Sequence, residues 1–158
     1  MTLAAGDPAP EFDLPRDGGG RLSLADLKGQ PAVLYFYPKD DTPGCTKEAC
    51  GFRDSWQALQ DAGIQVVGVS KDSVKRHDTF RSKYDLPFPL ISDSDGTLAQ
   101  AFGVLMEKTT ASGKPSTSVQ RSTFLLDADG VIRKAWPKVK VAGHVDEVLA
   151  AARELTPV

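Results

Sequence analysis

Two short, mainly apolar runs limit the folds that are open to this chain. They span residues 31–37 and 64–70. A strand that is apolar on both faces is typical of the centre of a sheet that is covered on both sides. A helical pattern separates the two runs, and further strand-like and helical runs alternate along the chain. This alternation predicts an α/β layer fold.

The remaining segments complete this pattern. Hairpins are expected around the glycine-containing turns at 17–20 and 127–130. Three further helices are expected, at about 73–84, 97–102 and 145–155. The segment from Glu107 to Ser118 is polar and rich in small residues, so we expect a mobile loop there.

Length and composition favour one domain and exclude several classes of partner. The chain has 158 residues, of which 41% are hydrophobic and 25% charged, which predicts a single domain over residues 1–158. A formal net charge of −2 gives no argument for nucleic acid or an anionic membrane as a partner. No apolar stretch approaches the roughly 20 residues of a membrane-spanning helix. The N-terminus lacks the features of a secretory signal, so a cytoplasmic location is expected.

The only two cysteines, Cys45 and Cys50, lie just after the first apolar run. Cys45 follows a Pro-Gly turn and is expected at a helix start, where peptide dipoles and unpaired N–H groups favour an anion. Such a position, with Lys47 nearby, stabilises the thiolate, which is the reactive form of cysteine. The alternative is a pair of free thiols that act as small apolar side chains. Two cysteines are too few for a disulfide scaffold in a chain of this length.

The expected helix, from Thr46 to about Asp61, separates the two thiols. An apolar stripe with 4-3-4-3 spacing runs along it through Cys45, Ala49, Phe52, Trp56 and Leu59. Cys50 lies roughly 140° around the helix from Cys45, and in an ideal helix their Cα atoms are about 8.6 Å apart. A disulfide needs Cα atoms within about 7 Å. Either the thiols never meet, or the first turns of the helix unwind.

The sequence gives no indication of a metal or cofactor site. The only histidines, His77 and His144, lie far from the cysteines at no metal-like spacing, so neither a metal nor a cofactor is expected. His144 stands near a helix start and is expected to be a surface or capping residue. The two Asp-x-Asp-Gly segments lack the glutamate that completes a calcium loop and are interpreted as turns.

The residues around the cysteines resemble those of a known family. Pro38, Thr42 and Cys45 form a Pro-x-x-x-Thr-x-x-Cys pattern that resembles the peroxidatic motif of the peroxiredoxins. Cys50 is similar in position to the resolving cysteine of the peroxiredoxin Q, or bacterioferritin-comigratory-protein, subfamily. The likeness covers nearly the whole chain, including residues 7–12 and the segment 121–125, where the family places its active-site arginine.

The resemblance implies both a fold and an activity. The fold is a thioredoxin-like α/β fold, in which a central mixed β-sheet is flanked by helices and preceded by an N-terminal β-hairpin. The activity is that of a thiol peroxidase, which reduces hydrogen peroxide and organic hydroperoxides. Cys50 would resolve the oxidised Cys45 within the same chain, so a monomer suffices. Thioredoxin or a similar dithiol would reduce the resulting disulfide.

Each residue of the motif has a chemical role to match. The Cys45 thiolate would attack the hydroperoxide and become a sulfenic acid, while Pro38 ends the strand and shields the thiolate from water. Thr42 would orient the peroxide, and Arg121 would stabilise both the thiolate and the charge that moves onto oxygen. Glu48 would hold Arg121 in place. Without the resemblance, Thr42 reads as a turn or cap residue, Arg121 as an exposed strand residue and Glu48 as a favourable acid in a first helical turn.

Two other functions remain open. The chain could be a redox-sensing module that passes oxidation to a partner protein by disulfide exchange, or a non-catalytic thioredoxin-fold binding domain. The binding domain would not explain Thr42, Cys45 and Arg121 together, and consumption of peroxide with only a dithiol reductant would separate the peroxidase from the redox sensor.

Overall fold

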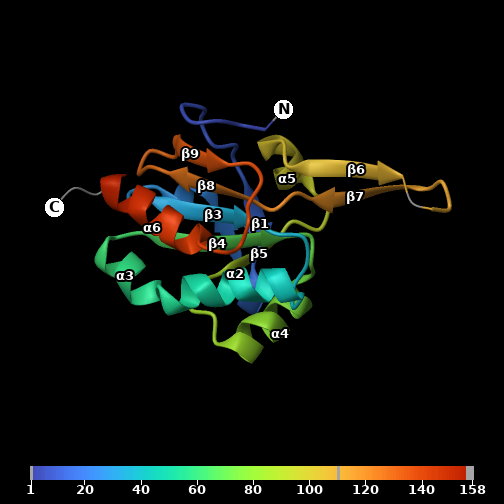
Figure 1. Cartoon of the computed structure of the whole chain (residues 1–158), viewed down its shortest axis with the longest axis horizontal. Helices are drawn as coiled ribbons and strands as arrows, with labels where there is room; N and C mark the ends of the chain where they lie inside the picture. The colour runs from blue at the N-terminus through green and yellow to red at the C-terminus, as the bar shows by residue number, and fades with distance from the viewer. Residues whose placement is uncertain (1, 110, 156–158) are drawn as a thin grey trace.

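The centre of the molecule is a five-stranded mixed sheet in the order β5-β4-β3-β8-β9 (Figure 1). We analysed a computed structural model, which describes residues 2–109 and 111–155. Strand β3 pairs in parallel with β4 and antiparallel with β8. At the edges, β5 pairs in parallel with β4, and β9 pairs antiparallel with β8. The strands are β3 Ala32–Phe36, β4 Gln65–Ser70, β5 Leu90–Ser92, β8 Ser122–Leu126 and β9 Ile132–Trp136.

The apolar run that predicts a central strand is the middle strand of this sheet. All five residues of β3 are buried. Leu34 and Phe36 face one hydrophobic core and Val33 and Tyr35 face the other, because successive side chains of a strand point to opposite faces. The prediction that this strand is covered on both sides is therefore confirmed.

Each face of the sheet is covered by its own set of helices (Figure 1). One core receives side chains from α2 Pro43–Asp54, α3 Trp56–Asp61, α4 Val74–Tyr84 and α6 His144–Leu155. The opposite core receives side chains from the N-terminal segment, α1 Leu24–Leu27 and α5 Thr97–Phe102. The helices predicted at 73–84, 97–102 and 145–155 are confirmed, and Ser73 caps α4 by accepting a hydrogen bond from the Arg76 amide. In the described part of the chain, no helix could cross a membrane.

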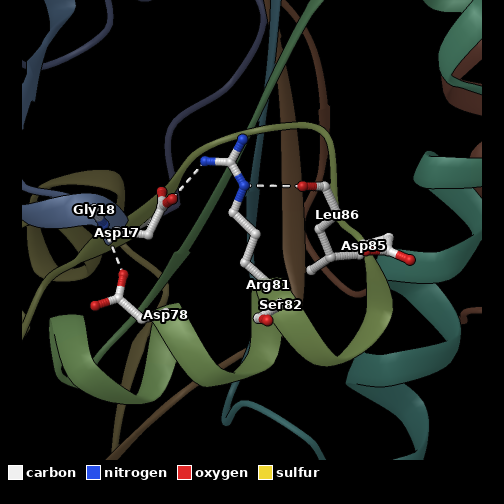
Figure 2. Close-up of a pocket in the computed structure, with 7 residues that line it drawn as sticks. All are labelled: Asp17, Gly18, Asp78, Arg81, Ser82, Asp85 and Leu86. Atoms are coloured by element: carbon white, nitrogen blue, oxygen red, sulfur yellow. Dashed lines mark hydrogen bonds and ion pairs between the residues drawn. The ribbon is translucent and has the colours of Figure 1, made fainter.

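The predicted N-terminal hairpin is present and is fastened to α4. It consists of β1 Asp13–Pro15 and β2 Arg21–Ser23, with the short 3-10 helix η1 Asp17–Gly19 between them. Figure 2 shows Arg81 of α4 pairing with Asp17 and donating to the Leu86 carbonyl, 2.9 Å away. Asp78 accepts the Gly18 amide at 2.6 Å. The cavity of about 420 Å³ beside these residues is thus lined by groups that hold the hairpin in place.

The prediction of a single helix from Thr46 to about Asp61 is wrong in one respect. Two helices, α2 and α3, occupy this stretch, with Ser55 between them at φ −95° and ψ 6°. The backbone bonds from Ser55 to Gly51 and from Leu59 to Ser55 continue through the junction. Because the helical register survives this one-residue break, the apolar stripe continues across it and the sequence pattern shows no interruption.

The prediction of a mobile loop from Glu107 to Ser118 is also wrong. This segment lies within an antiparallel hairpin made of β6 Leu105–Thr109 and β7 Pro115–Val119. The hairpin projects from the body of the molecule, as Figure 1 shows. A projecting ribbon has little apolar face to bury, so its sequence lacks the alternation by which strands are recognised.

Candidate active site

Cys45 lies in the first turn of α2 and faces the sheet. Thr42 is the N-cap residue and Pro43 opens the helix, with its fixed φ suited to that position. Cys45 is only 1% exposed and packs in the same core as Ala49 and Phe52. Because the first amides of a helix lack intrahelical acceptors, the thiol sits beside a concentration of partial positive charge.

Strand pairing brings Arg121 to this thiol. Strands β3 and β8 are antiparallel, with Phe36 opposite Ser122, so the residue before β8 lies next to the segment that leads from β3 into α2. The Arg121 Nη2 atom is 3.3 Å from Cys45 Sγ, and its Nη1 atom donates to Glu48 Oε1 at 2.8 Å. The structure therefore groups the cysteine, the arginine and the glutamate that the motif singles out.

The charges of this group leave an excess of positive potential at the sulfur. Glu48 is fully buried, and burial raises the pKa of its carboxyl to about 7 even though Arg121 lowers it. Burial lowers the pKa of Arg121, but Glu48 and Cys45 outweigh this effect and hold the pKa above its usual value. Arg121 thus stays charged while Glu48 is only partly ionised near neutral pH. The guanidinium charge that contacts the sulfur is therefore only partly balanced by the carboxylate.

Thr42 and Pro38 lie in the segment that leads from β3 into α2. The Thr42 hydroxyl donates to the Lys39 carbonyl at 2.8 Å, which closes a turn just before the helix. Its oxygen keeps lone pairs that can accept a hydrogen bond. Pro38 is exposed two residues beyond the end of β3. The peroxide-orienting role of Thr42 and the shielding role of Pro38 stay predictions.

Cys50 occupies a different side of α2. It is half-buried, and both cysteines are free thiols. Cys50 lines a groove of about 570 Å³ between α2 and the start of α6, together with the apolar Val141 and Val145 and the charged Lys47 and Asp54. Because α2 is continuous from Pro43 to Asp54, the thiols point to different surroundings, as the helical pattern predicts.

A buried cluster beside the site was not identified from the sequence. Tyr37 and Asp40 lie on either side of Pro38 and Lys39 in the chain, and the buried Asp40 carboxylate contacts both the Tyr37 hydroxyl and His77 of α4. His77, Phe80 and Tyr84 recur at helical spacing, which is a signal for a buried face that includes the histidine.

The prediction that His144 is a surface or capping residue is wrong. It is 3% exposed, and its Nε2 lies 2.8 Å from Thr123 Oγ1 on β8. Burial lowers its pKa to about 4, with Arg121 adding to the effect and Glu147 opposing it. The four-residue spacing of His144, Val148 and Ala152 marks the buried face of α6, which packs on the sheet.

Within the described residues, no group of three or more histidine, cysteine, aspartate or glutamate side chains could hold a metal ion.

Comparison with known proteins gives consistent matches over nearly the whole chain. The family described as "AhpC/TSA family" matches residues 5–135. A putative peroxiredoxin bcp of Coxiella burnetii is 57% identical over 149 residues, which cover 94% of this chain and 98% of that protein. The solved structure of Xanthomonas campestris peroxiredoxin Q has a TM-score of 0.87 at 46% identity, covering 92% of each chain. A further structure, of the X. campestris bacterioferritin comigratory protein, matches with the same TM-score at 45% identity and 92% coverage of each chain; its description concerns alkyl peroxide reduction activity.

Proposed function

Because this chain belongs to the Bcp/PrxQ subfamily of the AhpC/TSA peroxiredoxins, which are thiol peroxidases with a thioredoxin-like fold, we propose that Cys45 is its peroxidatic cysteine. The observation that carries this assignment is the contact of 3.3 Å between Arg121 Nη2 and Cys45 Sγ at a helix start. Cys50, in contrast, lines the groove between α2 and the start of α6, which it shares with Lys47. The two thiols are therefore assigned different roles.

In the first step the Cys45 thiolate attacks the terminal oxygen of a hydroperoxide. An S–O bond forms, the O–O bond breaks, and its electron pair leaves with the second oxygen, which takes up a proton to become water or an alcohol. Arg121 stabilises the negative charge as it moves from sulfur to oxygen. Glu48 holds the guanidinium, Thr42 orients the peroxide, and Pro38 limits the access of water. The X. campestris relative supports alkyl hydroperoxides as substrates beside hydrogen peroxide.

In the second step Cys50 attacks the sulfenic acid of Cys45. An S–S bond forms, the S–O bond breaks, and the oxygen leaves as water. In an ideal helix the Cα atoms of the two cysteines are about 8.6 Å apart, beyond the Cα–Cα limit of about 7 Å for a disulfide. The start of α2 must therefore unwind. An external dithiol, thioredoxin or a similar protein of the cytoplasm, then reduces the disulfide. The cycle needs only one chain, which is consistent with a monomer.

The decisive experiment is peroxide consumption by the purified chain, with a dithiol protein and its reductase as the only source of electrons. We expect many turnovers for the wild type and none for Cys45→Ser. A redox sensor would instead consume a single equivalent of peroxide and oxidise a partner protein. Full turnover by Cys45→Ser would remove Cys45 from the mechanism.

The unwinding of α2 is tested by amide hydrogen exchange on the reduced and disulfide forms. Exchange should accelerate from Thr46 to Arg53 in the disulfide form, because the first turns of a helix are the least stable part of it. The amides of β3 and β4 should keep their protection. A Cys45–Cys50 disulfide in which this part of α2 remains helical would contradict the mechanism.

A further inference from the structure

The loop that leads into the active-site helix is anchored in the core by one buried carboxylate. Asp40 is 2% exposed and accepts a hydrogen bond from the Tyr37 hydroxyl at 2.5 Å on Oδ1. Its Oδ2 lies 2.6 Å from Nδ1 of His77, which is completely buried. The other ring nitrogen of His77 lies 2.9 Å from the carbonyl oxygen of Ile91 in β5. Asp40 is thus tied to the sheet through α4.

The geometry fixes where the protons lie. A carbonyl oxygen can only accept, so His77 Nε2 carries a hydrogen toward Ile91. A separation of 2.6 Å between Nδ1 and Oδ2 likewise requires a hydrogen between them. The pair is therefore either an imidazolium with a carboxylate or a neutral imidazole with a carboxylic acid, and both forms share one proton. If either partner is removed, the facing atom of the other, Asp40 Oδ2 or His77 Nδ1, loses its hydrogen bond in a buried place, which is costly.

The backbone around Asp40 is held as firmly as its side chain. The Asp40 amide donates to Asp72 Oδ2 at 2.8 Å, and Asp72 is itself bonded to Ser70 and Arg76. The next residue, Asp41, has a left-handed φ of 58°, which is uncommon outside glycine. Its carboxylate binds the last turn of α4, at Lys83 Nζ (2.8 Å) and Tyr84 hydroxyl (2.7 Å).

This anchor reaches the active site through one hydrogen bond. Lys39 immediately precedes Asp40, and its carbonyl accepts the Thr42 hydroxyl at 2.8 Å. The orientation of that carbonyl depends on where Asp40 is fixed, and the lone pairs of Thr42 point accordingly. Thr42 is also the N-cap residue of α2, whose first turn carries Cys45. A displacement of Asp40 would therefore move the groups that receive the peroxide.

We propose that Asp40 and His77 are positioning residues for peroxide reduction, which hold the loop at 38–42 in the form that presents Thr42 and Cys45 to the substrate. The inference rests on the proposed peroxidase function, because it assigns the pair a role in the reaction of Cys45. It predicts that the loop governs the peroxide step and not the disulfide step.

Stopped-flow tryptophan fluorescence with a slight excess of hydrogen peroxide separates these two steps. The oxidation of Cys45 depends on peroxide concentration, whereas disulfide formation does not. For Asp40→Asn we expect the peroxide step to slow by about 10- to 100-fold, the scale reported for small misplacements of reacting groups, while disulfide formation is not slowed. The exposed Asp95→Asn is the matched control and should behave as the wild type does. An unchanged peroxide step in Asp40→Asn would overturn the proposal.

Two replacements of His77 separate its two contacts. In His77→Asn the amide nitrogen can stand near the place of Nδ1 and donate to Asp40, whereas in His77→Gln it can stand near that of Nε2 and donate to Ile91. We expect His77→Asn to keep more of the peroxide rate than His77→Gln. The reverse order would show that the histidine acts only by satisfying the β5 carbonyl, and would overturn the proposal.

A spectroscopic measurement covers the case in which these variants fold poorly. In the wild type, the shared proton should give a strongly downfield proton resonance coupled to His77 Nδ1, and Asp40→Asn should lose it. Its absence from the wild type would overturn the hydrogen-bond assignment. A wild type with this resonance but without any reaction at Cys45 would instead refute the proposed function.

Discussion

The two cysteines share one helix but lie in unlike surroundings on its two sides. On the sheet side, Cys45 is 1% exposed and faces Arg121 and Glu48. On the α6 side, Cys50 is half-buried beside a groove of about 570 Å³. The sheet side suits activation of a thiol, and the α6 side suits access by a second molecule. An intact α2 keeps these environments apart, so the disulfide that we propose between the two thiols requires the start of the helix to unwind.

The largest effect is expected from the replacement of Cys50, which tests whether the two thiols have different roles. Cys50→Ser should consume one equivalent of peroxide per chain and then stop turning over with a protein dithiol, because the sulfenic acid on Cys45 has no resolving thiol. Peroxide consumed per chain and mass spectrometry after a sulfenic-acid reagent measure both outcomes. Cys45→Ser serves as the control and should give neither the consumption nor the adduct. Sustained turnover by Cys50→Ser would show that resolution does not need this thiol.

The next effect concerns the cation that distinguishes the sheet side. Arg121→Ala should slow the oxidation of Cys45 by about 10²- to 10³-fold, as for the loss of one preorganised donor to a developing charge. The ultraviolet absorbance of the thiolate at neutral pH should fall as well, because a nearby cation favours the charged form. Arg121→Lys should recover part of the rate, since it restores charge without the paired donors. If Arg121→Ala changed neither rate nor absorbance, the arginine would be structural.

The contributions of His144 and Glu48 to stability should respond to pH with opposite sign. The pKa of His144 is about 4, below its usual 6.5, so the unfolded state binds more protons between these values and stability falls as pH drops from 6.5 toward 4. This loss amounts to about 3 kcal/mol at most. The pKa of Glu48 is raised from 4.5 to about 7, so its contribution to stability falls as pH rises through that range.

Urea denaturation between pH 4 and 8 separates these contributions. Relative to the wild type, His144→Gln should lose less stability at acidic pH, and Glu48→Gln should gain stability as the pH is raised toward 7. Parallel curves for the wild type and both variants would show that neither group titrates differently on folding.

The smallest effect is expected where α2 approaches α6. A Cβ on Gly51 would lie 2.9 Å from Val145 Cγ2, closer than normal packing allows. Gly51→Ala should therefore cost about 1–3 kcal/mol through overpacking, offset by about 1 kcal/mol of helix propensity. In a Val145→Ala background the same change should become stabilising by up to about 1 kcal/mol. Thermal unfolding of the wild type, the two single variants and the double variant measures the difference, and an equal effect of Gly51→Ala in both backgrounds would refute the contact.

Much of this arrangement follows from local sequence pattern. The placement of the two cysteines on different sides of α2 comes from helical periodicity alone, and the central position of β3 from its continuous apolar run. The approach of Arg121 to Cys45 does not, because it depends on the register between β3 and β8. Only the family resemblance indicated that arginine in advance.

The features that were missed share a physical cause. Asp40 is one of two adjacent aspartates in a polar loop, and nothing in their order shows that it is 2% exposed while Asp41 is on the surface. His77 and His144 are polar residues on the apolar faces of α4 and α6, where periodicity gives burial but no partner. The hairpin of β6 and β7 is held by backbone pairing, which leaves no pattern in the side chains.

The pairing of β3 with β8 also sets the order in which the thiol becomes reactive during synthesis. Both cysteines leave the ribosome early, whereas Arg121 follows Cys45 by 76 residues. Pairing between strands so distant in sequence forms late in folding, and chains emerge N-terminus first. A nascent chain therefore carries its thiols without the cation that contacts Cys45 in the folded protein. We expect pulsed alkylation during refolding to show Cys45 gaining its reactivity together with the completed sheet, so that an unfinished chain is spared oxidation by the substrate it will later consume.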